Sequence, residues 1–143
     1  MKSLFFDTDV ILDVSIAREI NINDSVKILN LVEEGVCKGY TSTIIFSNTY
    51  YVQRKLIGHD ISINFLKKLR LLLNVLNVDD LIIQKALESE FKDFEDAIQY
   101  FTAKEHGIDC IITRNVGDYI NHSFLPVYTP TEALKIIEKT NGT

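Results

Sequence analysis

The chain has 143 residues, of which 46% are hydrophobic and 24% charged, and its formal net charge is −5. These values are typical of one globular domain with a hydrophobic core, and no apolar stretch approaches the roughly 20 residues that a membrane span needs. The acidic balance argues against binding of long nucleic acid through a basic surface. It does not exclude a nuclease, because a bound cation reverses the local sign of clustered acids.

The cysteines and the first residues indicate a compartment. Cys37 and Cys110 are too few for a disulfide framework and lack the spacing of a zinc site. A predicted strand begins within the first few residues, so we expect no signal peptide. We therefore expect a cytoplasmic protein with two free thiols and no membrane association.

Apolar runs and helical periodicities alternate along the sequence. The first half is predicted to form a strand (3–6), a short helix from near residue 10, a helix capped within 21–23 that ends near 35, a strand (39–42) and two helices (45–56 and 61–73). The second half is predicted to form a strand (74–78), a helix capped by residue 79 that runs to 87, a helix (94–106) and two strands (109–113 and 126–128). A capping box over 129–132 begins the last helix. Strands separated by helices imply a mostly parallel sheet with helices on both faces. We predict an α/β fold, in which a single domain over 1–143 forms a three-layer sandwich.

Acidic side chains follow the first predicted strand. Asp7 and Asp9 come directly after the apolar run Leu4-Phe5-Phe6, which is typical of a buried strand that delivers acids to the carboxyl edge of a sheet. Asp7 is therefore a candidate ligand of Mg²⁺ or Mn²⁺. Asp9 could support that site or cap the next helix. Asp13 is interpreted as a solvated residue.

A second acidic cluster, Asp93-Phe94-Glu95-Asp96, opens the helix predicted over 94–106. Asp93 is interpreted as the cap of this helix and is kept among the residues that could orient ligands or water. Asp96 begins the face expected to point toward the strand ends, which makes it a candidate metal ligand. Glu95 is expected to face solvent.

Polar residues also follow the strand predicted over 109–113, at an edge where loops of such folds carry function. Thr113 could orient a water molecule or cap a turn, and Asn115 could coordinate a cation or stabilise a tight turn. Asp118 supplies a further carboxylate. Arg114 could contact a phosphate, although a single surface Arg is usually solvated. Together, three acid-bearing edges predict a site for a hard divalent cation.

The helix predicted over 45–56 carries aromatic and basic side chains. Tyr50 and Tyr51 are interpreted as packing or dimer residues rather than as platforms for base stacking. Arg54 and Lys55 could meet a phosphate backbone, although a solvated role is the favoured interpretation.

These stretches resemble the PIN-domain nuclease family, especially the VapC-type, toxin-like branch found in toxin–antitoxin pairs. The matching stretches are 4–13, 40–42 with 48–52, 93–97 and 112–115. The resemblance implies a parallel sheet flanked by helices, acids gathered at one edge, and Mg²⁺- or Mn²⁺-dependent cleavage of RNA phosphodiester bonds. It also implies a homodimer that a small antitoxin protein neutralises.

The resemblance also assigns roles to individual residues. Asp7 matches the first family acid and Asp96 the third. The second position, usually Glu, falls on Asn48, and the fourth, often Asp, falls on Asn115, with Asp118 nearby as a substitute. In the implied mechanism a cation is held by Asp7, Asp96 and Asp118, with Asn115 as a further ligand. The residues that orient ligands and water are Asp9 (where the family usually has Asn), Asn48, Thr113 and Asp93.

Two other functions remain open at this point. The neutral residues Asn48 and Asn115 are compatible with a catalytically silent PIN-like module that binds RNA or protein, because ligand charge tunes cation affinity. The run Phe6-Asp7-Thr8-Asp9-Val10 also satisfies the first motif of haloacid-dehalogenase-type phosphohydrolases, with Asp7 as nucleophile and Asp9 as acid/base. The residues after Thr113 do not supply the Lys and acid pair that this second family needs.

Overall fold

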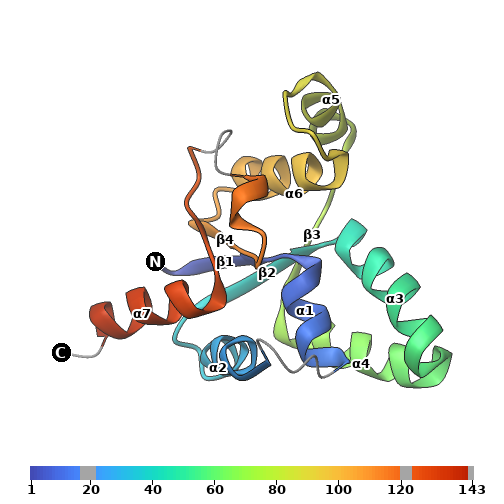
Figure 1. Ribbon diagram of the computed structural model, residues 1–143, viewed down its shortest axis with the longest axis vertical. Helices are drawn as coiled ribbons and strands as arrows, with labels where there is room; N and C mark the ends of the chain where they lie inside the picture. Colours follow the sequence, from blue (N-terminus) through green and yellow to red (C-terminus); the bar gives the residue numbers. More distant parts are fainter. Residues whose placement is uncertain (17–21, 120–123, 142–143) are drawn as a thin grey trace.

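The computed structural model describes residues 1–16, 22–119 and 124–141 (Figure 1). Its strands are β1 (Ser3–Phe6), β2 (Lys38–Ser42), β3 (Asn74–Leu76), β4 (Cys110–Ile112) and β5 (Val127–Tyr128). Its helices are α1 (Thr8–Ser15), α2 (Ile22–Glu33), α3 (Thr43–Ile57), α4 (His59–Leu72), α5 (Asp80–Glu88), α6 (Phe94–Glu105), α7 (Pro130–Asn141) and the short 3₁₀ helix η1 (Val116–Asp118). None of the helices over the described residues is long and apolar enough to cross a membrane.

The five strands form one sheet in the order β3-β2-β1-β4-β5, and every neighbouring pair is parallel. The central strand β1 pairs through Phe5 with Tyr40 of β2 on one side and with Ile111 of β4 on the other. A parallel strand covered on both faces needs a continuous apolar run, and all three residues of the run Leu4-Phe5-Phe6 are buried. The predicted α/β fold with a parallel central sheet is confirmed.

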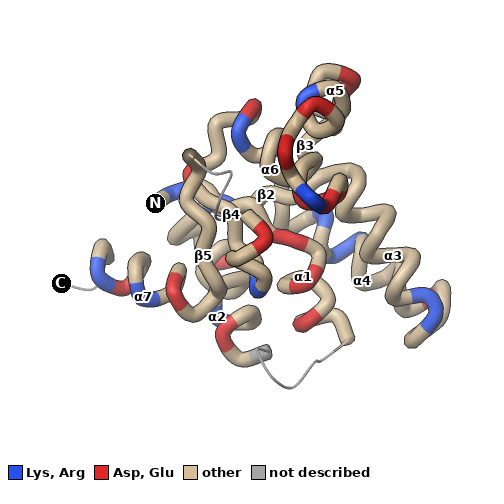
Figure 2. The backbone as a smooth tube through the Cα atoms, turned by 45° about the horizontal axis from the view of Figure 1, so that its top comes forward, with Lys and Arg blue, Asp and Glu red and all other residues tan. Residues whose placement is uncertain are grey.

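Helices cover both faces of this sheet. Helices α5 and α6 lie on one side, and α1, α2 and α7 lie on the other (Figure 1). Helices α3 and α4 pack against each other as a pair that projects beside the sheet. Because β1 and β4 are parallel neighbours, their carboxyl ends reach the same edge, and Asp and Glu positions from separate segments gather there (Figure 2).

The start of α1 differs from the prediction in a way that matters for the site. The helix begins at Thr8 rather than near Val10, and its N-cap is Asp7, whose Oδ1 accepts a hydrogen bond from Thr8 N at 2.6 Å. The interpretation of Asp9 as the cap is therefore wrong, because the chain turns into the helix directly after β1. Asp9 instead lies in the first turn of α1.

Other predicted helix starts hold. Asp79 caps α5 by accepting from Ile82 N at 3.0 Å. In the capping box of α7, Thr129 N donates to Glu132 Oε1 and Glu132 N donates to Thr129 Oγ1, both at 3.1 Å. Of the caps predicted within 21–23, Asn21 lies outside the described residues.

A substitution at Gly39 tests how closely the layers pack. A methyl group at this buried position of β2 would overlap the Leu73 side chain and lie 3.0 Å from Val32 Cγ1. Overpacking of this kind costs about 1–3 kcal/mol, so we expect Gly39→Ala to lower the Tm in thermal unfolding by several degrees. Gly117→Ala is the matched control, since a Cβ there meets nothing within 4 Å. Equal Tm values for the two variants would contradict this packing.

Candidate active site

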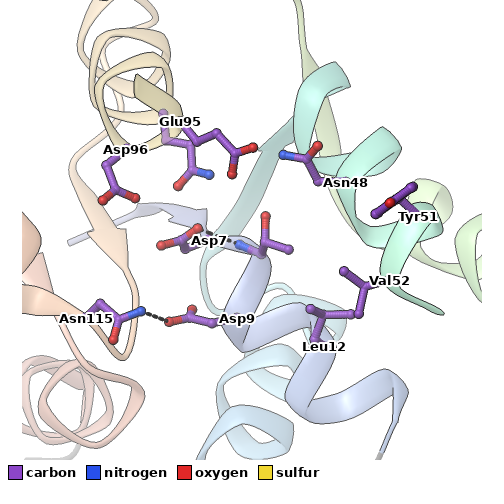
Figure 3. A pocket seen from close by; sticks show the side chains of 11 residues that line it. Asp7, Asp9, Leu12, Asn48, Tyr51, Val52, Glu95, Asp96 and Asn115 are labelled. Carbon is purple, nitrogen blue, oxygen red and sulfur yellow. Dashed lines mark hydrogen bonds between the residues drawn. The ribbon is translucent and has the colours of Figure 1, made fainter. Parts of the chain in front are cut away.

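A pocket opens at the carboxyl edge of the sheet, between the starts of α1 and α6 and the side of α3 (Figure 3). Side chains that are far apart in sequence line it together. They are Asp7, Thr8, Asp9, Leu12, Asn48, Tyr51, Val52, Glu95, Asp96, Gln99 and Asn115. Four of them are carboxylates, and none of the described residues that line the pocket is Lys or Arg.

Asp7 is held at the base of the pocket. Its backbone N–H donates to Ile112 O of β4 at 3.0 Å, which continues the pairing of the two strands by one residue. The side chain is 6% exposed, and its Oδ2 accepts from Thr113 Oγ1 at 2.8 Å. Because both the cap of α1 and Thr113 fix this carboxylate, it points into the pocket in one orientation.

Asp9 fastens the segment after β4 to α1. Its Oδ2 accepts hydrogen bonds from Arg114 N and Asn115 Nδ2, each at 3.1 Å, and from Thr113 Oγ1 at 3.3 Å. Its Oδ1 is buried and has no hydrogen-bond partner among the described residues. This carboxylate therefore keeps a free oxygen beside Asp7.

Asp96 meets Asp7 through a residue that the sequence does not single out. The Tyr119 hydroxyl lies 3.3 Å from Asp7 Oδ2, 3.4 Å from Asp96 Oδ1 and 2.8 Å from Gln99 Oε1. Its side chain is fully buried. The expected meeting of Asp7 and Asp96 is confirmed. Tyr119 follows a polar loop with no periodic pattern, so only the fold shows its place.

The remaining acids take different positions. Glu95 lines the pocket (Figure 3), so the expectation that it faces solvent is incomplete: its side chain is exposed, but on the pocket side of α6. Asp93 is the exposed cap of α6 and accepts from Asp96 N at 3.0 Å, as interpreted. Asp118 lies in η1, exposed and outside the pocket lining, although its charge acts on Asp96.

The charge cluster changes the protonation of the carboxyls. Burial, followed by the charge of Asp9, raises the pKa of Asp7 from 3.8 to about 7. Burial also raises the pKa of Asp9. Burial, followed by the charges of Asp93 and Asp118, raises the pKa of Asp96 to about 6. At each of these carboxyls burial disfavours the ionised form, and at Asp7 and Asp96 the neighbouring negative charges add to the effect.

These donors fit a hard divalent cation that keeps part of its water shell. Among residues 1–16, 22–119 and 124–141, no three His, Cys, Asp or Glu side chains form a ready-made ion site. Mg²⁺ does not require one, because it commonly binds through one or two carboxylates and retains several waters. The unpartnered Asp9 Oδ1 and the raised pKa values of Asp7 and Asp96 are the features that such a cation would relieve.

The two Asn residues also lie in the pocket. Asn48 stands on α3 across from the acids, and its Nδ2 is buried without a hydrogen-bond partner among the described residues. Asn115 donates its Nδ2 to Asp9 and thereby orients this loop. The amide oxygen, rather than the amide nitrogen, is the group of either residue that could face a cation.

Asp13 and Arg114 correct the sequence analysis. Asp13 is fully buried rather than solvated, and its Oδ2 lies 3.1 Å from Arg114 Nε and 3.4 Å from Ser25 Oγ. The Nε of Arg114 therefore faces Asp13 and its side chain is only 27% exposed, so this residue is not simply solvated, and its contact with a phosphate stays a prediction. The ion pair and the Arg114 N–H bond to Asp9 fix the segment after β4 at two points on α1.

The fold and this site define a PIN domain: residues 3–117 match the family model for the PIN domain, and the chain belongs to that family. The haloacid-dehalogenase interpretation is thereby replaced. Among curated proteins, the chain is similar to Ribonuclease VapC1 of Aquifex aeolicus (strain VF5), with 27% identity over 123 residues that cover 82% of this chain and 85% of the relative.

Solved structures of related proteins share the fold. A toxin–antitoxin complex from Klebsiella pneumoniae matches with a TM-score of 0.63 and 23% identity, covering 89% of this chain and 97% of that one. VapC20 of Mycobacterium tuberculosis, a toxin that cleaves the sarcin–ricin loop, matches with a TM-score of 0.61 and 17% identity. The match covers 76% of this chain and 86% of that one. VapBC2 from Rickettsia felis, bound to a promoter DNA fragment, matches with a TM-score of 0.67 and 10% identity. The match covers 87% of this chain and 96% of that one.

The raised pKa of Asp7 predicts a pH-dependent cost to stability. The folded state holds the Asp7 proton up to about pH 7, whereas the unfolded chain releases it near 3.8. Stability from this group is therefore lost as pH rises between these values. In EDTA, we expect the Tm of the wild type relative to that of Asp7→Asn to fall from pH 4 to pH 7.5. A constant difference across this range would contradict the shift.

Proposed function

We propose that this chain is a ribonuclease that uses Mg²⁺ or Mn²⁺ to hydrolyse RNA phosphodiester bonds, and that it is the toxin-like component of a toxin–antitoxin pair. Its membership of the PIN family and its similarity to a VapC ribonuclease support this function. The single observation that carries it is the meeting of Asp7 and Asp96 at the Tyr119 hydroxyl in a pocket without lining Lys or Arg among its described residues.

We assign Asp7 and Asp96 as the main ligands of the cation. Asn115 from the pocket lining and Asp118 from η1 complete the proposed set. Asp9, Asn48, Thr113 and Asp93 would orient ligands and water. This assignment is supported by the contacts of Asp7 with Thr113 and by the charge of Asp118 acting on Asp96.

The residues of the chain prepare the reaction. When bound, the divalent cation supplies an activated water and neutralises charge on the phosphate. Asp7 and Asp96 must be ionised to hold it. The Thr113 hydroxyl orients Asp7 by a hydrogen bond, and the Tyr119 hydroxyl lies between the two carboxylates. Asp9 holds residues 113–115 against α1, which keeps Asn115 at the pocket. Fixed orientation of this kind is what makes a ligand set effective.

We also propose a homodimer and a small antitoxin protein as partner. The solved relatives include toxin–antitoxin complexes, which supports an antitoxin.

A second candidate is a PIN module that binds but does not cleave. The observation that favours it is the pair of neutral residues in the pocket, Asn48 and Asn115. Neutral Asn at two of the four family acid positions lowers the ligand charge at those positions and thereby weakens cation affinity. This candidate predicts no measurable heat of Mn²⁺ binding.

One experiment separates the two candidates. Purified full chain is incubated with single-stranded RNA in EDTA, and Mn²⁺ or Mg²⁺ is then added in excess. We expect cleavage only after the cation is added, together with saturable Mn²⁺ binding in calorimetry. Absence of both cleavage and Mn²⁺ binding would refute the ribonuclease and favour the silent module.

A further inference from the structure

The pocket has two unlike sides. Carboxylates of Asp7, Asp9, Glu95 and Asp96 gather on one side (Figure 3). The opposite side is formed by α3 and α1 and carries Tyr51 together with the aliphatic residues Val52 and Leu12 (Figure 3). A ligand that fills the pocket must therefore match charge on one side and present a flat or apolar group to the other.

Tyr51 is the exposed aromatic residue of this second side. It is 56% exposed even though it lies on the pocket wall. The ammonium of Lys55, one helical turn further along α3, lies 4.0 Å from the centre of its ring. A cation over one face holds the ring in place. Within the chain Tyr51 is therefore exposed rather than packed in the core, and the alternative interpretation as a dimer residue stays a prediction.

The neighbouring Tyr50 shows the contrast. Its hydroxyl is hydrogen-bonded to His59 Nδ1 at 2.7 Å, and its ring packs edge-on against the His59 ring. Tyr50 therefore closes the turn between α3 and α4 and lies outside the pocket lining. The two consecutive tyrosines have different environments, and only Tyr51 offers an aromatic ring to a ligand.

Nucleotides combine the chemistry that the two sides require. Their phosphate is drawn to a cation held by carboxylates, and their base is a flat ring that stacks on aromatic side chains. In a duplex both faces of a base are already stacked, so a base free to meet a protein ring belongs to a single strand, loop or bulge. The Lys55 ammonium places a positive charge beside this ring, and such charge attracts the phosphates of a nucleic-acid backbone.

We propose that Tyr51 and Lys55 form a base-stacking subsite, in which one unpaired nucleobase of the substrate RNA lies on the Tyr51 ring next to the phosphate that is cleaved. Lys55 covers one face of the ring, and the base takes the other. This inference rests on the proposed ribonuclease function and adds to it the residues of this chain that contact a base beside the cleaved phosphate.

The test compares variants of the ring with RNAs that have or lack bases. Affinities of the wild type, Tyr51→Leu and Tyr51→Phe are measured by fluorescence anisotropy in Ca²⁺, using a short single-stranded RNA and a fully abasic oligomer of equal length. Stacking on an aromatic ring accounts for roughly a ten- to hundredfold gain in affinity. We expect Tyr51→Leu to lose this gain for the RNA and to bind the abasic oligomer as the wild type does.

Controls make the outcome specific to the ring. Tyr51→Phe keeps the ring and should recover most of the affinity lost in Tyr51→Leu. Leu56→Ala, at an exposed position of α3 outside the pocket lining, should bind both oligomers as the wild type does. In cleavage assays with Mn²⁺, Tyr51→Leu should raise KM by the same factor and change kcat little.

Each outcome decides one claim. Equal RNA affinity of the wild type and Tyr51→Leu, or an equal loss for RNA and abasic oligomer, overturns the subsite. A loss in Tyr51→Phe as large as in Tyr51→Leu also overturns it, because the hydroxyl rather than the ring would then matter. Absence of cleavage with intact ring-dependent binding refutes the ribonuclease function and leaves the subsite standing.

Discussion

Asp7→Asn is expected to reduce metal-dependent RNA cleavage on the order of a thousandfold and to abolish the heat of Mn²⁺ binding, while the chain remains folded. The reason is that Asp7 is the buried carboxylate at the base of the pocket, and an amide removes its charge without changing its size. A bound cation stabilises the charge of the transition state by several kcal/mol, and each ~1.4 kcal/mol changes the rate tenfold.

The fold of this variant can be checked separately. An Asn side chain can still accept from Thr8 N at the start of α1, as the carboxylate does. Circular dichroism in EDTA should therefore show the wild-type spectrum. Asp80→Asn is the matched control, because Asp80 is an exposed acid in the first turn of α5 and lies outside the pocket lining. Wild-type cleavage by Asp7→Asn would falsify the role of this carboxylate.

Tyr119→Phe is expected to weaken Mn²⁺ binding roughly ten- to a hundredfold, the effect typical of losing a partner that orients metal ligands. The ring fills the same buried space in both variants, so the change removes only the hydroxyl that lies among Asp7, Asp96 and Gln99. Without this hydroxyl the two carboxylates lose the polar group that lies between them and are free to separate. Calorimetry with Mn²⁺ and single-turnover cleavage would measure the two effects.

Tyr100→Phe is the control for Tyr119→Phe. Tyr100 is equally buried on α6, but its hydroxyl accepts from Phe124 N at 3.3 Å and lies outside the pocket lining. We expect Tyr100→Phe to bind Mn²⁺ as the wild type does. Equal Mn²⁺ affinities for Tyr119→Phe and the wild type would show that the hydroxyl does not position the ligands.

Much of the fold could be predicted because its rules are local. The run Leu4-Phe5-Phe6 predicted β1 with correct bounds, since a central parallel strand must be apolar on both faces. The capping box at Thr129 and the cap at Asp79 were readable because both contacts span three residues. The meeting of Asp7 with residues after β4 also followed from local patterns, since parallel neighbours share their carboxyl edge.

What the sequence left undetermined depends on contacts between distant segments. Tyr119 contacts Asp7 and Asp96 from the end of a short 3₁₀ turn, and no hydrophobic periodicity in the sequence predicts the course of that turn. The burial of Asp13 depends on Arg114, about a hundred residues away along the chain and paired with it only once β4 lies beside β1. The side of α6 that Glu95 faces depends on how that helix is placed over the sheet, which sequence periodicity does not fix.

The position of β1 between β2 and β4 has a consequence for synthesis on the ribosome. Leu4 is translated long before its pairing partner Cys110, and Thr113 and Tyr119 follow Cys110. A nascent polypeptide therefore carries Asp7 without either hydroxyl beside it until the segment through Tyr119 has been made. Under the proposed function, the ribosome meets no assembled RNA-cleaving site before that segment has emerged and folded.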